Sequence, residues 1–335
     1  MTMQDAGPSE CHRAARHGPH LLPRARRRLL AALLGALALP RLAGCAAVAG
    51  AAAPPWQARL RGDTIALLGE VHDNPTLHRL RAEALRRAVE AGWRPVLVME
   101  QFDIDRQDDI ERGRREHPRD ARALIAAAGA PRGWDWAYYE PLVALALAHD
   151  LPLVAGNLSR TAATRVMREG PAAVLGEARA RALGLLDPVD PALLAAQERA
   201  IDLGHCGALP GALLPAMARA QFARDAVMAG LLREHAGGGA VLLAGDGHVR
   251  RDLGVPRWLG GVAPERLLSV GFVETGQPAL DGRYDALVVA APPKRDDPCR
   301  DFVAPRAVAV VSAAQADRAT SPMRSPDEAD RHASR

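Results

Sequence analysis

Residues 64–74 read TIALLGEVHDN, and residues 240–249 read AVLLAGDGHV. Each stretch begins with a continuous apolar run and then changes to the pattern Gly-x-x-His, at Gly69–His72 and at Gly245–His248. Short, continuous apolar runs that end in glycine are typical of strands buried on both faces of a parallel sheet. The two stretches therefore predict two buried parallel strands, each of which ends in a glycine and a histidine.

Similar apolar runs recur along the chain and alternate with longer helical segments. The predicted strands are Thr64–Leu68, Pro95–Met99, Leu151–Ala155, Ala240–Ala244, Leu267–Val273 and Tyr284–Ala290. The predicted helices cover residues 75–91, 103–128, 139–149, 159–183, 189–203 and 211–235. This alternation predicts an α/β fold with a mostly parallel sheet flanked by helices, in which the last two strands form an antiparallel edge. Residues 159–236 contain no predicted strand and are expected to form a helical cap segment.

Polar residues follow the predicted strands at the ends where ligands bind in open parallel sheets. Glu70 and His72 follow the first strand, Glu100 the second, Asn157 the third, and His248 the fourth. A divalent transition metal held by His72, His248 and Glu70 would suit these residue types, as would acid–base chemistry on a bound water. Histidines that only pack or cap loops, and a Glu100 that only caps the next helix, remain the structural alternatives.

A second group of candidate ligands lies away from the strand ends. Tyr138 and Tyr139 stand in an aromatic cluster with Trp134 and Trp136, and His205 and Cys206 occupy a loop bounded by glycine. Phenolate, imidazole and thiolate groups can all bind iron. Packing in the core is the structural alternative for the aromatic residues, and a buried structural thiol is the alternative for Cys206.

The N-terminal segment has the three parts of a secretory signal. Arginines at 24 and 26–28 precede an apolar run from Leu29 to Leu39, which is followed by Leu42-Ala43-Gly44-Cys45. An apolar run this short cannot cross the bilayer core, which takes roughly 20 helical residues. The last four residues resemble a bacterial lipobox, so we expect lipid on Cys45 and removal of residues 1–44, a signal peptide with an overlong start. The expected location is the bacterial cell envelope, with the lipid anchor in the outer membrane.

Charge and cysteine content narrow the possible classes of protein. The formal net charge is +4, but seven arginines of residues 1–44 face only Asp5 and Glu10, so the basic character belongs to the leader. No basic stripe with interleaved aromatic residues occurs, and we expect no nucleic-acid partner. Only Cys206 and Cys299 remain after Cys11 and Cys45 are set aside, which is too few for a disulfide framework. We expect a tether at 45–56, the α/β domain at 57–291 and a disordered tail at 292–335.

Several segments of this chain together resemble the ChaN-like haem-binding uptake lipoproteins of the Tiki superfamily. They are ALLGEVHDNPTLHRL, VLVMEQFD, YYEPLVALALAHDLPLVAGNLSR, HCGALP with MARAQFARDAVMA, and LLAGDGHVRRDLGVP. The resemblance implies a Tiki/erythromycin-esterase-like fold with pocket residues at Gly69, Glu70, His72, Glu100, Asn157, Arg160, Gly245 and His248. It also implies haem as the cofactor, a tyrosine as iron ligand, and haem pairs held between two protomers.

Two functions follow from the motifs and the resemblance. The first is an envelope lipoprotein that binds haem or iron for uptake, with Tyr138, Tyr139, His205 and Cys206 as haem-ligand candidates and a homodimer as its assembly. The second is a metal-dependent hydrolase that uses the paired Gly-x-x-His site, with Glu70 or Glu100 activating water. The sequence leaves open whether the protein is an enzyme, although a binding protein is favoured.

Overall fold

The computed structural model describes residues 54–277, 282–297 and 299–300. The strands are β1 (Ile65–Leu68), β2 (Val96–Asp103), β3 (Leu153–Asn157), β4 (Ala240–Leu243), β5 (Leu267–Glu274) and β6 (Ala286–Ala290). The α-helices are α2 (Pro75–Glu90), α3 (Gln107–Glu116), α4 (Ala121–Ala127), α5 (Trp136–Ala148), α6 (Arg160–Glu169), α7 (Pro171–Leu175), α8 (Glu177–Ala182), α9 (Pro191–Gly204), α10 (Leu214–Glu234) and α11 (Asp246–Val249). Short 3-10 helices include η1 (Pro55–Arg59), η2 (Ile104–Arg106) and η5 (Val255–Trp258).

The strands form one sheet in the order β3-β2-β4-β1-β5-β6, and every neighbouring pair is parallel. The predicted α/β class and all six strands are confirmed, but the predicted antiparallel edge is wrong. The segment 275–285 between β5 and β6 is longer than a hairpin turn of two to five residues. β6 begins at the same end of the sheet as β5, and Val270 pairs with Ala286 in the parallel direction.

Alternate residues of each central strand pack against helices on opposite faces of the sheet. Ala66 and Leu68 belong to a core with α2, α4, α5 and Trp56 of η1. Ile65 and Leu67 belong to a second core with α10 and η5. Burial on both faces explains why these strands are continuously apolar.

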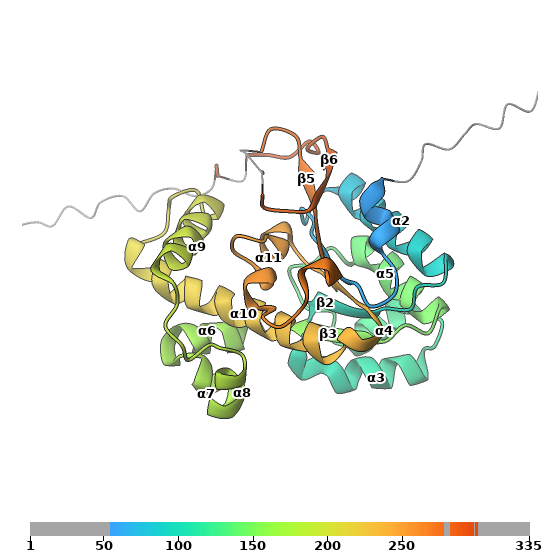
Figure 1. Cartoon of the computed structure of the whole chain (residues 1–335), viewed down its shortest axis with the longest axis horizontal. Coiled ribbons are helices and arrows are strands. Elements are labelled where there is room, and N and C mark those ends of the chain that lie inside the picture. Colours follow the sequence, from blue (N-terminus) through green and yellow to red (C-terminus); the bar gives the residue numbers. More distant parts are fainter. Residues whose placement is uncertain (1–53, 278–281, 298, 301–335) are drawn as a thin grey trace, which may run out of the picture. The chain divides into compact units, whose positions relative to one another are not determined.

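Helices α6 to α10 form the predicted cap segment, in which α6, α7 and α9 pack on the long helix α10 (Figure 1). The predicted helix at 159–183 is divided into three by Gly170 and Gly176, which both adopt positive φ angles. The predicted helix at 103–128 is also divided, because Pro118 follows α3 and Asp120 caps the start of α4. None of the described helices is long and apolar enough to span a membrane.

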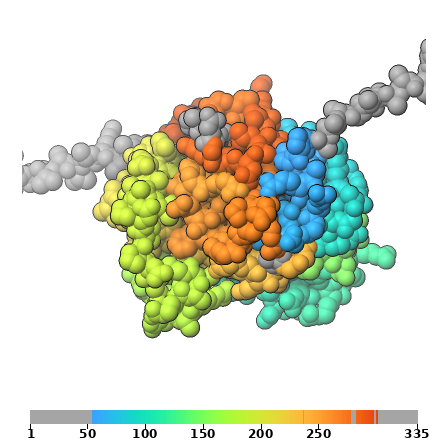
Figure 2. All heavy atoms as spheres, viewed as in Figure 1, coloured from blue at the N-terminus to red at the C-terminus, as the bar shows by residue number. Residues whose placement is uncertain are grey.

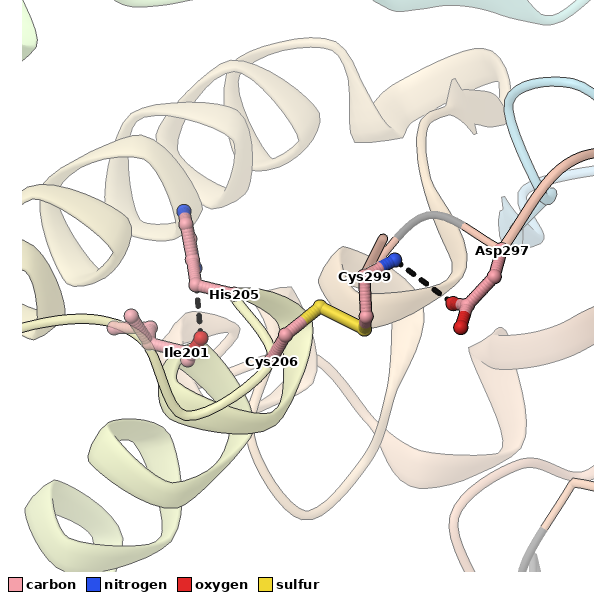
Figure 3. The surroundings of a disulfide bond; sticks show 5 residues. All are labelled: Ile201, His205, Cys206, Asp297 and Cys299. Carbon is pink, nitrogen blue, oxygen red and sulfur yellow. Dashed lines mark hydrogen bonds between the residues drawn. A yellow bond between two sulfur atoms is a disulfide. The ribbon is translucent and has the colours of Figure 1, made fainter. Parts of the chain in front are cut away.

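Both ends of the described chain are tied to the domain. Trp56 of η1 packs edge-on against Phe272, so the fold begins inside the expected tether. Arg295 forms ion pairs with Asp73 and Glu274, and Cys299 forms a disulfide with Cys206 (Figure 3). Part of the segment expected as a disordered tail from residue 292 is thus held against the domain, and Cys206 and Cys299, too few for a disulfide framework, form a single bond. The leader, Cys45 and residues 301–335 lie outside the described residues.

Candidate functional site

The two Gly-x-x-His elements pack directly against each other. A Cβ atom on Gly245 would lie 2.8 Å from Cε1 of His72, and one on Gly69 would lie 2.4 Å from Cγ2 of Val249. The backbone N–H of Asp246 also donates to the carbonyl of Glu70 over 2.9 Å. Glycine is thus required at both positions by close approach, which joins the ends of β1 and β4 into one site.

Glu70 lies in a buried polar network beneath this junction. Its Oε1 accepts hydrogen bonds from Nδ1 of His72 at 2.8 Å and from the hydroxyl of Tyr139 at 2.9 Å. Nε2 of His78 lies 3.5 Å from Oε2 and donates to the carbonyl of His72 at 3.1 Å. The fully buried Arg81 donates to Nδ1 of His78, which fixes the histidine tautomer.

The charge states in this network follow from burial and from the neighbouring charges. Burial alone would raise the pKa of Glu70, but the His72 hydrogen bond and the charge of Arg81 outweigh it and lower that pKa. Burial and the charge of Arg81 lower the pKa of His78 to about 4, so this imidazole is neutral at pH 7. Burial would lower the pKa of His72, yet Glu70 and Glu100 raise it.

His248 joins two carboxylates from distant parts of the chain. Its Nδ1 donates to Oδ1 of Asp225 at 2.6 Å, and its Nε2 lies 3.3 Å from Oε1 of Glu100. The other Glu100 oxygen accepts from the backbone N–H of Gly245 at 2.8 Å. Asp225 is on α10, so this triad attaches the helix to the carboxyl end of the sheet.

The triad holds His248 as a cation. Burial would lower the pKa of His248, but the carboxylates of Glu100 and Asp225 outweigh it and raise that pKa to about 10. Burial would raise the pKa of Glu100, but the charges of His248 and His72, together with the hydrogen bonds from His248 and Gly245, lower it to about 2. An imidazolium has no lone pair to offer a metal or a proton.

Among the described residues, this arrangement gives no support to the predicted metal set of His72, His248 and Glu70. Both nitrogens of His248 face carboxylates, whereas Nδ1 of His72 is engaged by Glu70. In the described part of the chain, no group of three His, Cys, Asp or Glu side chains is placed to hold a metal ion. These side chains instead form hydrogen-bonded ion pairs.

A polar cleft of about 920 Å³ opens beside the junction. His72, Glu100, Asn157 and Arg160, all expected as pocket residues, line it. β2 continues to Asp103 and β3 to Asn157, so Glu100 and Asn157 lie within strands instead of after them. The structure therefore brings the expected strand-end residues to one edge of the sheet. Figure 2 shows the segment after β4, in orange, between blue η1 and the yellow-green cap helices.

A second, largely apolar groove of about 770 Å³ lies between α2 and α5. Tyr138 lines it, and its ring stacks on His78 with centroids 4.7 Å apart. Arg79, Arg86 and Arg87 also line this groove. The groove and the polar cleft share no lining residue, and the network of Glu70 and His78 lies between them.

The other predicted haem ligands lie elsewhere. Tyr139 is fully buried and donates to Glu70, which leaves no open position for iron. Cys206 is disulfide-bonded and offers no thiolate, so its prediction as a ligand is wrong. His205 caps the end of α9, and its Nδ1 donates to the carbonyl of Ile201 in that helix at 2.7 Å (Figure 3). Of the four haem-ligand candidates, Tyr138 lines the apolar groove, and the other three do not.

Asp225, His78 and Arg81 were not predicted as site residues. A signal for Asp225 exists in the sequence, because it is a lone acid in the stretch FARDAVMAGLL of α10. His78 and Arg81 are three residues apart, on the buried face of α2. Their long-range partners depend on the order of the strands, which periodicity does not provide.

Comparisons with known proteins support the family suggested by the motifs. The family model described as "Haem-binding uptake, Tiki superfamily, ChaN" matches residues 56–259. The structure of ChaN of Campylobacter jejuni with cofacial haem is similar, with a TM-score of 0.54 and 20% identity over 69% of this chain and 88% of that chain. A Bacillus cereus protein covers 66% of this chain and 68% of its own, with 12% identity and a TM-score of 0.35.

No curated protein matches the chain. The similarity to the Campylobacter structure shows a shared fold, since the identity is low. The family model, in contrast, covers more than half of the sequence and includes both Gly-x-x-His elements. The chain belongs to the ChaN family of haem-binding uptake proteins in the Tiki superfamily.

Proposed function

We propose that this protein is an envelope lipoprotein that binds haem in the groove between α2 and α5 and serves haem or iron uptake. The observation that carries the proposal is the combination of an apolar surface, a tyrosine and arginines in one groove of about 770 Å³. Haem offers a broad apolar face, an iron that needs an axial ligand, and two carboxylates. The apolar lining residues, Tyr138 and the arginines of the groove match these three features of haem in turn.

The apolar part of the groove suits a flat porphyrin. It is lined by Pro75, Leu80, Ala82, Ala137, Pro141, Ala144, Leu145 and Ala148. Most of these side chains are small, so they leave room for a planar ring between the two helices. The low aromatic content of the chain, 4%, is therefore compatible with haem.

In this proposal, Tyr138 is the axial ligand of the haem iron. Of the three tyrosines in the chain, Tyr139 donates to Glu70, and Tyr284 donates to the carbonyl of Asp246. Tyr138 lines the groove, and the buried His78 supports the face of its ring. A tyrosine phenolate is an established axial ligand for haem iron.

Arginines of α2 would bind the haem propionates. Arg86 pairs with Glu83 and Glu90, and Arg87 pairs with Glu83. Arg79 pairs with no carboxylate in the described residues, so its guanidinium is open to a ligand carboxylate. We include in the proposal a second copy of the chain that covers the outer face of the haem.

Export and lipid attachment at Cys45 are part of the same proposal. The leader supplies a signal sequence and a lipobox-like Leu-Ala-Gly-Cys. The disulfide between Cys206 and Cys299 supports an oxidising compartment such as the periplasmic side of the envelope.

Titration of the purified chain with hemin tests the haem assignment. We expect a saturable Soret band whose tyrosinate-type spectrum is lost in Tyr138→Phe. Tyr139→Phe is the matched control and should keep that spectrum, because Tyr139 is buried away from the groove. A wild-type chain that gives no saturable band would refute haem binding, and an unchanged Tyr138→Phe spectrum would refute the ligand.

A further inference from the structure

The rim of the polar cleft carries more arginine charge than carboxylate charge, because Asp103 lines it together with Arg132, Arg160 and Arg224. Arg132 and Arg160 both line the cleft and are exposed, and neither pairs with a carboxylate in the described part of the chain. Other exposed arginines, such as Arg112 and Arg122, do pair with acids. An arginine fork with no protein partner can take a carboxylate or a phosphate in two parallel hydrogen bonds.

Two further features add to this rim. Arg224 lines the cleft, and its Nε is buried without a hydrogen-bond partner among the described residues. Arg160 and Thr161 are the first residues of α6, a helix of 10 residues whose N-cap is Ser159. The positive end of this helix therefore faces the same cleft and favours an anion.

The inner wall of the cleft presents a hydrogen-bond acceptor, whereas the rim presents positive charge. Asn157 is 7% exposed, and its Oδ1 has no hydrogen-bond partner in the described structure. A buried acceptor without a hydrogen-bond partner is unfavourable, because it has lost its water without gaining a donor. Because Oδ1 is an acceptor, it calls for an O–H or N–H donor on a bound molecule. Glu100 lines the same wall, while His248 balances its charge.

We propose that this cleft is a second ligand site, which binds a small hydroxy acid independently of haem. The acidic group, a carboxylate or a phosphate, pairs with Arg132, Arg160 and Arg224. A hydroxyl group of the ligand donates to Oδ1 of Asn157. The site is distinct from the haem groove because the two cavities share no lining residue.

Isothermal titration calorimetry of the full chain with citrate and with glycerol 3-phosphate tests this site. The two probes share the hydroxyl and differ in the acidic group, so they separate a carboxylate ligand from a phosphate ligand. We expect saturable binding of at least one probe, weakened about tenfold or more in Arg160→Gln through loss of a charge-assisted hydrogen bond. Asn157→Ala should weaken the same probe.

Arg165→Gln is the matched control, since Arg165 is on the same helix but pairs with Glu169. It removes the same charge and should leave probe binding unchanged. Absence of binding of both probes at up to ~10 mM, or equal weakening by Arg165→Gln, would overturn the proposal. Each variant is also titrated with hemin. An unchanged hemin affinity in Arg160→Gln supports two separate sites, whereas a parallel loss would contradict them.

Discussion

Nδ1 of His248 donates a 2.6 Å hydrogen bond to Oδ1 of Asp225, across 23 residues of sequence. This bond connects the second Gly-x-x-His element to α10, while Glu100 holds the other ring nitrogen from β2. The histidine therefore acts as a buried cation that fastens the helical cap segment to the sheet.

Replacement of His248 should strongly destabilise the fold. His248→Gln leaves the buried carboxylates of Asp225 and Glu100 without their cation, and breaking such a pair costs about 3–5 kcal/mol. Urea denaturation should show this loss. His117→Gln, at the C-cap of α3, is the control and should change the unfolding free energy little. Equal stability of His248→Gln and the wild type would rule out a buried ion pair.

His248 should also make the free energy of unfolding depend on pH in the neutral to alkaline range. The pKa of His248 is raised from 6.5 in the unfolded chain to about 10 in the fold. A group whose pKa is raised by folding contributes its full stabilisation at pH values below its pKa in the unfolded chain. This contribution falls as the pH rises towards its pKa in the folded protein. The difference in unfolding free energy between wild type and His248→Gln should therefore shrink between about pH 6 and pH 10. A constant difference over this range would mean that His248 is neutral.

Gly245 should tolerate no side chain. A Cβ atom there would meet the His72 ring at 2.8 Å, and such overpacking typically costs about 1–3 kcal/mol. Gly247→Ala, two residues away, is the matched control because a Cβ at that position has no neighbour within 4 Å. Thermal unfolding should thus separate the two variants, and equal melting temperatures would show that the two elements do not pack as described.

The disulfide should contribute to stability through the long loop that it closes. Cys206 and Cys299 are 93 residues apart, and removing a native disulfide typically costs about 2–5 kcal/mol. Cys206→Ser, Cys299→Ser and the double variant should show the same loss in urea denaturation, since each removes the same bond. A larger effect in the double variant would indicate that the thiols are not paired.

The sequence predicted the sheet better than it predicted the site. Short, mostly apolar runs identified all six strands, and burial on both faces makes this local signal continuous in the central strands. The direction of β6 was predicted wrongly. Direction depends on the end of the sheet at which the strand begins, and the residues of the strand itself do not encode this.

The strand-end residues lie together at one edge of the sheet, as expected from the sequence, but the side chains that pair with them were not predicted. The pairing of His248 with Asp225 depends on where α10 crosses the sheet. The disulfide joins Cys206 to Cys299, which lies beyond the expected end of the domain. Both are contacts between segments far apart in sequence, and neither composition nor periodicity encodes them. Tyr138 and Tyr139 are adjacent, but Tyr138 is partly buried and lines the α2–α5 groove, whereas Tyr139 is fully buried.

Hemin binding to a chain whose groove is filled tests whether the porphyrin lies between α2 and α5. Ala144 is exposed and lines the α2–α5 groove, so Ala144→Trp would occupy the space proposed for the porphyrin. Ala178→Trp places the same side chain at an exposed position on α8 as a control. Saturable Soret binding in wild type and Ala178→Trp, with its loss in a folded Ala144→Trp, is the predicted result. Wild-type affinity for hemin in Ala144→Trp would rule out haem binding in the α2–α5 groove.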